Sequence, residues 1–412
     1  MANTLATPLW TTKEVARGYT NKVRFIANTN RTYDSQYEIN GAKVGRTVNA
    51  RLPQIFTVSD GEAYQPQAIY DQTVPITLTN QKQVAFGYSS AQATTDLDNI
   101  RRRYTNPGAS AMANAADVLA FQAVYRDVWN VIGTPGTTPS TTLAYLQAGT
   151  KLTDQATDMD GRVAVLDPLA MQTLANTSTA LFNPSAAISA NYRNGMFAGN
   201  QLGISEWYQD PNRPVHTTGT FTASTPLTNG ASQTGSTLVC NGWASSATTL
   251  NRGDIFTIAG VNSVNPLSKQ STGRLQQFVV TATTSDSAGA MAALPISPSI
   301  ITSGQLQTVD ASPTDDAVIT VLGATSPTGG TLATTTSPQG FVYHPDAFVF
   351  VMADLMKPSA GATSEVVRDK EVNVSIRYVE QYVSATDQNN NRLDMLIGAA
   401  TLQARLACRV MG

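Results

Sequence analysis

The sequence predicts an α+β protein in which an all-β domain is inserted into an α/β lobe. Two patterns carry this prediction. Residues 110–132 have apolar side chains every three or four positions, which is typical of a helix, and short β runs separated by turn residues fill 214–340. Helical signals return after Phe341, so the β-rich stretch interrupts the lobe rather than following it.

Composition narrows the possible function classes. Only 14% of the 412 residues are charged, against about 25% in an average soluble domain. The net charge is -2 without a long basic run, so broad electrostatic binding of nucleic acid is not expected. Neither a signal peptide nor an apolar run of about 18 residues is visible, so we expect no membrane association. Low charge fits a surface covered by neighbouring subunits, and it equally fits a secreted β-rich protein.

The first 88 residues predict an arm followed by a β excursion. Thr11 and Glu14 form a capping box for a modest amphipathic helix whose apolar face runs to Val23 and Ile26. Strand-like runs then occur at 44–48, 54–58, 70–78 and 83–88, with a turn signal at 59–62. We predict a long two-stranded excursion with a loose tip. Because an isolated hairpin is marginal in water, the excursion needs a surface to cover it.

The strongest helical pattern follows, and the central lobe comes after it. Residues 110–132 predict a rod of about 33 Å that is apolar on two sides and ends at Gly133. A short helix at 141–152, a buried strand at 162–166 and a helix starting at Pro168 predict an α/β lobe over 137–213. Later segments are predicted as a strand and short helix at 341–356, a strand at 371–383 and a return to the core at 396–410.

Three stretches resemble tailed-bacteriophage coat proteins of the podovirus type, which carry an extra β-barrel in a Hong Kong 97-like capsid fold. Residues 251–261 have the sequence NRGDIFTIAGV, and the downstream QFVV at 277–280 fits the next strand of that barrel. The sequence FVYHPDAF at 341–348 resembles the element after the insertion, and RLACRV at 405–410 resembles the closing strand.

The resemblance implies a domain plan for the chain. It consists of an N-terminal arm (1–41), an extended loop (42–88), a peripheral domain with a long spine helix (89–136 and 393–412), an axial α/β domain (137–213 and 341–392) and an inserted β-barrel (214–340).

The resemblance also implies a function. Many copies, arranged as hexamers and pentamers, would form the icosahedral shell of the virion in the bacterial host cytoplasm. A scaffolding protein, a portal, packaged double-stranded DNA and a decoration protein are the implied partners, and the shell would expand as DNA enters. One capsid lineage cross-links its subunits through a lysine of the extended loop. No lysine lies between Lys43 and Lys82, so we predict non-covalent assembly.

Two groups of residues are candidate contacts. The first group is proposed to contact neighbouring subunits and comprises Arg51, Asp60, Glu62, Tyr64 and Tyr70. The alternative is a mobile, exposed tip. The second group, Arg101, Arg102 and Arg103, fits contact with DNA phosphates or an acidic neighbour. The alternative for these arginines is a solvated helix face paired with Asp96 and Asp98.

Enzymatic interpretations find little support in the sequence. The two histidines, His216 and His344, are far apart, and no motif of a common hydrolase, nucleotide-binding or metalloprotease family occurs. We therefore predict neither catalytic residues nor a metal or cofactor, and expect Cys240 and Cys408 to be buried thiols. Residues 158–161 and 252–254, which resemble a calcium loop and an integrin-binding tripeptide, are expected to be turns. The rival function is a secreted, Thr/Ser-rich surface or adhesin protein.

Overall fold

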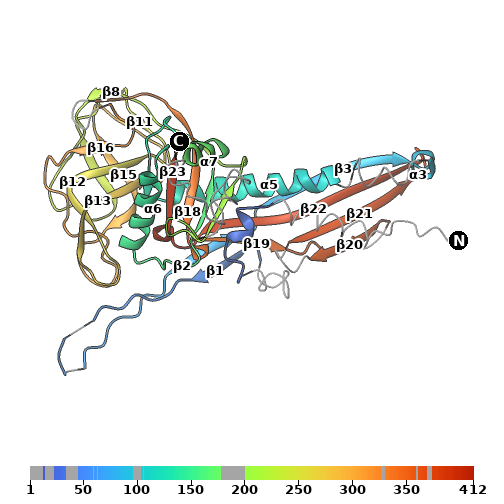
Figure 1. The fold of residues 1–412 in the computed structure, drawn as a ribbon, viewed down its shortest axis with the longest axis horizontal. Coiled ribbons are helices and arrows are strands. Elements are labelled where there is room, and N and C mark those ends of the chain that lie inside the picture. The colour runs from blue at the N-terminus through green and yellow to red at the C-terminus, as the bar shows by residue number, and fades with distance from the viewer. Residues whose placement is uncertain are drawn as a thin grey trace. The chain divides into compact units, whose positions relative to one another are not determined.

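The computed structural model describes residues 13, 23–33, 45–58, 60–62, 64–95, 104, 106–177, 200–325, 330–358, 361–368 and 374–412 (Figure 1). The chain divides into two compact units, which are described separately. The first consists of Met1–Arg51, Thr73–Ala123 and Phe348–Leu402. The second consists of Leu52–Gln72, Val124–Ala347 and Gln403–Gly412. Both units combine helices with antiparallel strands, as an α+β fold requires.

The first unit is built on a five-stranded antiparallel sheet. Its central strand is β22, which pairs with β19 and β21 along one edge and with β3 along the other, while β20 pairs with β21. The strands are β3 (Asn80–Ser89), β19 (Phe348–Ala353), β20 (Thr363–Arg368), β21 (Ser375–Val383) and β22 (Gln388–Thr401). Strands at 83–88 and 375–383 confirm those two predictions. The short helix expected before Met356 is only the turn η5 (Pro345–Ala347), because the β-branched and aromatic run from Phe348 joins the sheet as β19.

Helix α5 (Asn106–Val124) belongs to this unit up to Ala123. A Cβ placed on Gly108 would lie 3.3 Å from Cδ1 of Leu393, so the first turns of α5 approach β22 closely. The predicted helix over 110–132 is wrong at both ends. It begins earlier because Pro107 is tolerated in a first turn. It ends earlier because Tyr125–Asp127 form the 3-10 helix η3, and Val131–Ile132 form strand β4.

The described part of the N-terminal arm packs against α5. Phe25 stacks on Phe121 with ring centroids 4.0 Å apart, and Asp117 accepts the backbone N–H of Arg24 (3.1 Å) and of Ile26 (3.3 Å). Ile26 lies in the 3-10 helix η1 (Ile26–Asn28), so the predicted α-helical face does not continue to this residue. The capping box at Thr11 and Glu14 lies outside the described residues.

Strands β1 (Thr47–Arg51) and β2 (Thr73–Thr77) form an antiparallel pair in which Thr47 faces Thr77 and Arg51 faces Thr73. The exposure of β1 alternates strictly along the strand, with Val48 and Ala50 buried. Residues 54–58, predicted as a strand, form none, because no backbone ladder joins them to a partner. A short helix, α3 (Ser90–Thr95), follows β3.

The second unit contains a six-stranded sheet with the order β16-β12-β13-β15-β10-β9. Its strands are β9 (Leu227–Thr228), β10 (Gly235–Asn241), β12 (Ile255–Val264), β13 (Ser271–Val280), β15 (Met291–Ile300) and β16 (Ile319–Val321). The two ends of this order meet, since Leu227 bridges to Val318 and the Ile319 N–H donates to the Pro226 carbonyl at 2.9 Å. Two small pairs, β11 (Thr249–Leu250) with β14 (Thr284–Ser285) and β8 (Phe221–Ser224) with β17 (Gly330–Leu332), lie in the same stretch of chain.

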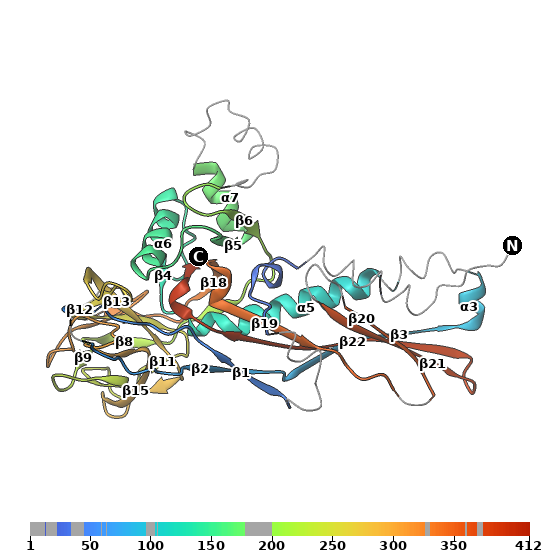
Figure 2. The same cartoon turned by 90° about the horizontal axis from the view of Figure 1, so that it is seen from below.

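A second sheet of this unit, with the order β4-β23-β18-β5-β6, carries two helices (Figure 2). Its strands besides β4 are β5 (Val163–Leu166), β6 (Glu206–Gln209), β18 (Thr336–Tyr343) and β23 (Ala407–Met411), and β7 (Val215–Thr217) pairs with β18. Helices α6 (Thr142–Asp154) and α7 (Pro168–Thr177) pack on it through Tyr145 and Met171, among others. The predicted helices at 141 and 168 and the buried strand at 162–166 are confirmed. The further helix expected at Asn183 lies outside the described residues.

Candidate inter-subunit contact segment

Residues 52–72 connect β1 to β2 and are held together by side-chain amides instead of a backbone ladder. The Gln54 amide bonds the backbone of Tyr70 twice, donating to its carbonyl at 2.6 Å and accepting its N–H at 3.2 Å. The Gln67 amide bonds the backbone of Thr57 in the same two ways, accepting its N–H at 2.9 Å. Two glutamines thus keep the two runs of the 52–72 segment together without a second layer of protein.

The turn of the segment explains its local sequence. Asp60, Gly61 and Glu62 lie at its tip, and Gly61 has φ +109°, a conformation that an L side chain rarely adopts. The sequence prediction of a turn at 59–62 is therefore confirmed for the three described residues. Ser59 lies outside them.

Large apolar side chains of the segment remain in contact with solvent. Val58 is 96% exposed, Tyr64 90% and Ile69 75%, while Phe56 and Tyr70 are each more than half exposed. Single exposed apolar residues are ordinary, but five within one short segment mark a surface suited to a protein partner. Strand-like alternation at 54–58 was the only signal in the sequence for Phe56 and Val58, and Ile69 gave none.

The structure places the predicted contact residues as follows. Asp60, Glu62, Tyr64 and Tyr70 all lie in the 52–72 segment and are exposed. Arg51 is exposed at the end of β1, and its carbonyl accepts the hydroxyl of Tyr33 at 3.4 Å. Arg101, Arg102 and Arg103 lie outside the described residues, as do Asp96 and Asp98.

Histidine chemistry in the structure serves the fold. His216 on β7 is buried, and its Nε2 lies 2.8 Å from Oδ1 of Asp254. The other carboxylate oxygen of Asp254 accepts the backbone N–H of Gly219 at 2.9 Å and of Asn251 at 2.8 Å. Arg252-Gly253-Asp254 therefore forms a turn whose carboxylate is already occupied within the fold. His344 lies 3.5 Å from the exposed Asp346 and forms no comparable network among the described residues.

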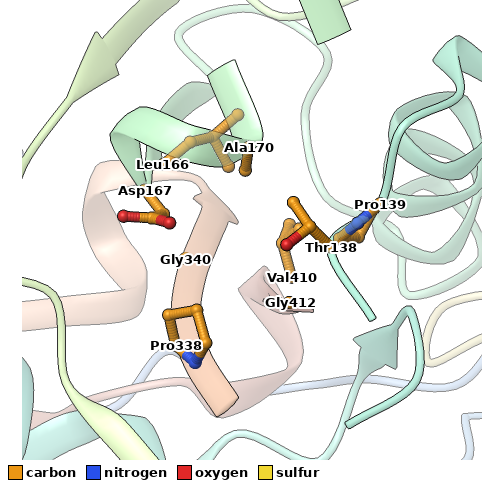
Figure 3. Close-up of a pocket in the computed structure, with 9 residues that line it drawn as sticks. All are labelled: Thr138, Pro139, Leu166, Asp167, Ala170, Pro338, Gly340, Val410 and Gly412. Carbon is orange, nitrogen blue, oxygen red and sulfur yellow. The ribbon is translucent and has the colours of Figure 1, made fainter. Parts of the chain in front are cut away.

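One pocket lies where β18 and β23 meet the start of α7 (Figure 3). Its empty volume of about 220 Å³, which includes adjoining solvent, is below the roughly 300–1,000 Å³ of small-molecule sites. The one carboxylate of its lining, Asp167, is bound by Nε of Arg213 at 2.5 Å. Burial raises the pKa of Asp167, and the Arg213 guanidinium opposes that rise.

Other features considered in the sequence have ordinary structural roles. Cys240 and Cys408 are buried thiols, and burial raises the pKa of Cys240 to about 11 and of Cys408 to about 12. Residues 158–161 form a turn before β5, in which the Asp158 carbonyl accepts Nε of Arg162 at 2.7 Å. In the described part of the chain, no group of three or more His, Cys, Asp or Glu residues could hold a metal ion. The helices described there lack the length and apolarity needed to cross a membrane.

A family profile described as P22 coat protein, gene protein 5, matches residues 57–411. That span takes in most of the 412 residues and both units, so the molecule is a structural coat protein of a tailed bacteriophage, its major capsid protein. The chain belongs to the P22 coat protein family. It is a component of the virion that assembles in many copies, and the secreted adhesin alternative receives no support.

Solved phage structures resemble the chain over most of its length. A structure from Mycobacterium phage Che8 is 15% identical, with 94% of this chain and 90% of that chain covered and a TM-score of 0.45. The capsid of Ralstonia phage GP4 is 9% identical, with 94% and 87% covered and a TM-score of 0.44. The CUS-3 coat protein I-domain is 29% identical over 25% of this chain and 97% of that domain, with a TM-score of 0.19. No curated protein sequence matches the chain.

Proposed function

We propose that this coat protein forms an icosahedral shell around phage DNA by non-covalent assembly, with the 52–72 segment docked on neighbouring copies. One observation carries the proposal: Phe56, Val58, Tyr64, Ile69 and Tyr70 are exposed together on a segment held only by side-chain amides. An interface needs about 800 Å² from each partner, and an extended segment supplies area without requiring a thick core. Asp60 and Glu62 would form a polar rim around these side chains.

The family assignment supports the domain plan. We assign an arm to 1–41, an extended loop to 42–88, a peripheral domain to 89–136 and 393–412, an axial domain to 137–213 and 341–392, and an inserted β-barrel to 214–340. Helix α5 would be the spine helix of the peripheral domain. The six-stranded sheet whose end strands meet would be the barrel.

The partners proposed for the shell follow the same logic. Hexamers and pentamers would assemble in the host cytoplasm on a scaffolding protein and around a portal, and the shell would expand during DNA packaging. A decoration protein would bind outside. Arg101, Arg102 and Arg103 would contact DNA phosphates or an acidic neighbour. The absence of lysine between Lys43 and Lys82 supports assembly without cross-links through the loop.

Negative-stain electron microscopy tests the proposal. The purified chain, alone and with an acidic helical scaffolding protein, should form closed shells or rings. Boiling in denaturant should return a single band at the subunit mass, because no covalent link joins the copies. Persistent monomers under both conditions would contradict assembly, and a ladder of cross-linked bands would contradict its non-covalent nature.

A further inference from the structure

The 52–72 segment touches the β-rich part of its own chain through one side chain. Oε1 of Gln67 accepts a hydrogen bond from Nε2 of Gln305 at 2.8 Å. The same oxygen accepts the Thr57 N–H at 2.9 Å, so both of its lone pairs are used. Between Asp60 and Gln72, Gln67 is the one described residue that is not exposed. The contact therefore joins the amide that holds the two runs together to a point outside the segment.

Gln305 is itself held firmly. It lies in the loop that follows β15, and the base of that loop is closed by bonds from the N–H groups of Thr308 (2.9 Å) and Val309 (3.2 Å) to the Ile301 carbonyl. Val309 is fully buried in the core of the six-stranded sheet. At the top of the loop, Nζ of Lys269 donates to the Gln305 carbonyl at 2.5 Å. Both the base and the backbone of the loop at Gln305 are therefore fixed to the sheet.

We propose that Gln305 is a positioning residue for assembly, which fixes the direction of the 52–72 segment in the free subunit before a second copy of this chain binds it. This inference rests on the proposed function of the segment. A segment held in its bound arrangement loses less conformational entropy on docking, and the apparent affinity scales with the fraction of molecules in that arrangement. The β-rich part then has a role in assembly that requires no contact of its own with the neighbour.

The size of the effect follows from the single bond. Removing one neutral hydrogen bond between half-buried amides changes the held fraction about three- to tenfold. Gln305→Ala removes the donor. Gln305→Glu keeps the shape of the side chain but replaces the donor with an oxygen that faces Oε1 of Gln67. We expect the two variants to behave alike, because the lost group is the N–H donor and not the side-chain volume.

Hydrogen–deuterium exchange of the monomeric subunit tests the positioning role. Peptides covering 52–58 and 64–72 should exchange about three- to tenfold faster in Gln305→Ala and Gln305→Glu, while those covering β12 and β13 keep the wild-type rate. The matched control is Gln307→Ala, because Nε2 of Gln307 bonds the Val309 carbonyl within the loop and not the segment. Unchanged exchange at 52–58 and 64–72 in both Gln305 variants would overturn the proposal.

Assembly of the same variants tests the consequence. The concentration at which half the subunits enter shells should rise about three- to tenfold for both Gln305 variants and stay unchanged for Gln307→Ala. Faster exchange with an unchanged half-assembly concentration would overturn the role in assembly. If the wild-type chain formed no shells, the proposed function would fail, and the exchange rates alone would still decide whether Gln305 positions the segment.

Discussion

The six-stranded sheet and the 52–72 segment of the same unit place similar side chains in opposite environments. Phe256 and Phe278 on β12 and β13 are buried with ring centroids 5.7 Å apart, whereas Phe56 is 58% exposed. A backbone ladder holds β12 to β13, whereas the amides of Gln54 and Gln67 hold the segment. The difference separates apolar surface that folds the chain from apolar surface that remains for partners.

The largest expected effect comes from removing a ring from the sheet. Phe278→Ala should lower the free energy of unfolding by about 3–5 kcal/mol, since it leaves a cavity in a closed core. The matched change Phe56→Ala should alter it by less than about 0.5 kcal/mol, because the ring is already mostly solvated. Urea unfolding of both variants measures the contrast. Equal losses would show that the segment is part of the folding core.

Assembly should reverse the order of the two regions. The double variant Phe56→Ala/Ile69→Ala should raise the half-assembly concentration about a hundredfold, because burying two such side chains contributes about 3 kcal/mol or more. Light scattering against subunit concentration measures this. Met159→Ala removes a side chain that is 63% exposed in the turn before β5 and serves as the control, with little change expected. Normal shells from the double variant would remove the segment from the interface.

The buried charges beneath the β-rich part should matter more than the exposed ones. Asp254→Ala should lower the free energy of unfolding by about 2 kcal/mol or more, since His216 and two backbone N–H groups lose their acceptor. Asp127→Ala breaks a half-exposed pair with Arg252 and should cost below about 1 kcal/mol. Thermal unfolding of the two variants compares them, and a larger loss for Asp127→Ala would contradict the assignment.

The smallest effect concerns acid. Burial alone would raise the pKa of Asp310, but hydrogen bonds from Asn262 and Ser271 outweigh it and the pKa is lowered. A carboxyl group with a lowered folded-state pKa stabilises the fold above its unfolded value, near 3.9, and that contribution is lost as pH falls through the lower folded value. Asp310→Asn should therefore flatten the decline in stability below about pH 4. An unchanged acid slope in urea titrations would show that Asp310 contributes nothing.

Local patterns in the sequence predicted most of the strands and helices that pack within one unit. Pro168 and the apolar run at 162–166 located α7 and β5 because a first-turn proline and a buried strand depend on neighbouring residues alone. The end of α5 was missed because Val131 and Ile132 suit a helix and a strand equally, and pairing with β23 decides between them. That partner is distant in the sequence.

The candidate site was predicted only in part for a related reason. Asp60, Glu62, Tyr64 and Tyr70 were found as polar or aromatic residues near a turn. Phe56 and Val58 were assigned to a strand, because alternation does not reveal whether the partner is a backbone or a pair of glutamine side chains. The contact of Gln67 with Gln305 spans 238 positions, and no local pattern announces it.

Cryo-electron microscopy of assembled particles tests the central claim most directly, because it shows the surroundings of Phe56, Tyr64 and Ile69 in the shell. The account predicts that these three side chains lie against an adjacent copy and lose most of their exposure. Closed shells in which the 52–72 segment remains in solvent, or lies only on its own subunit, would contradict it.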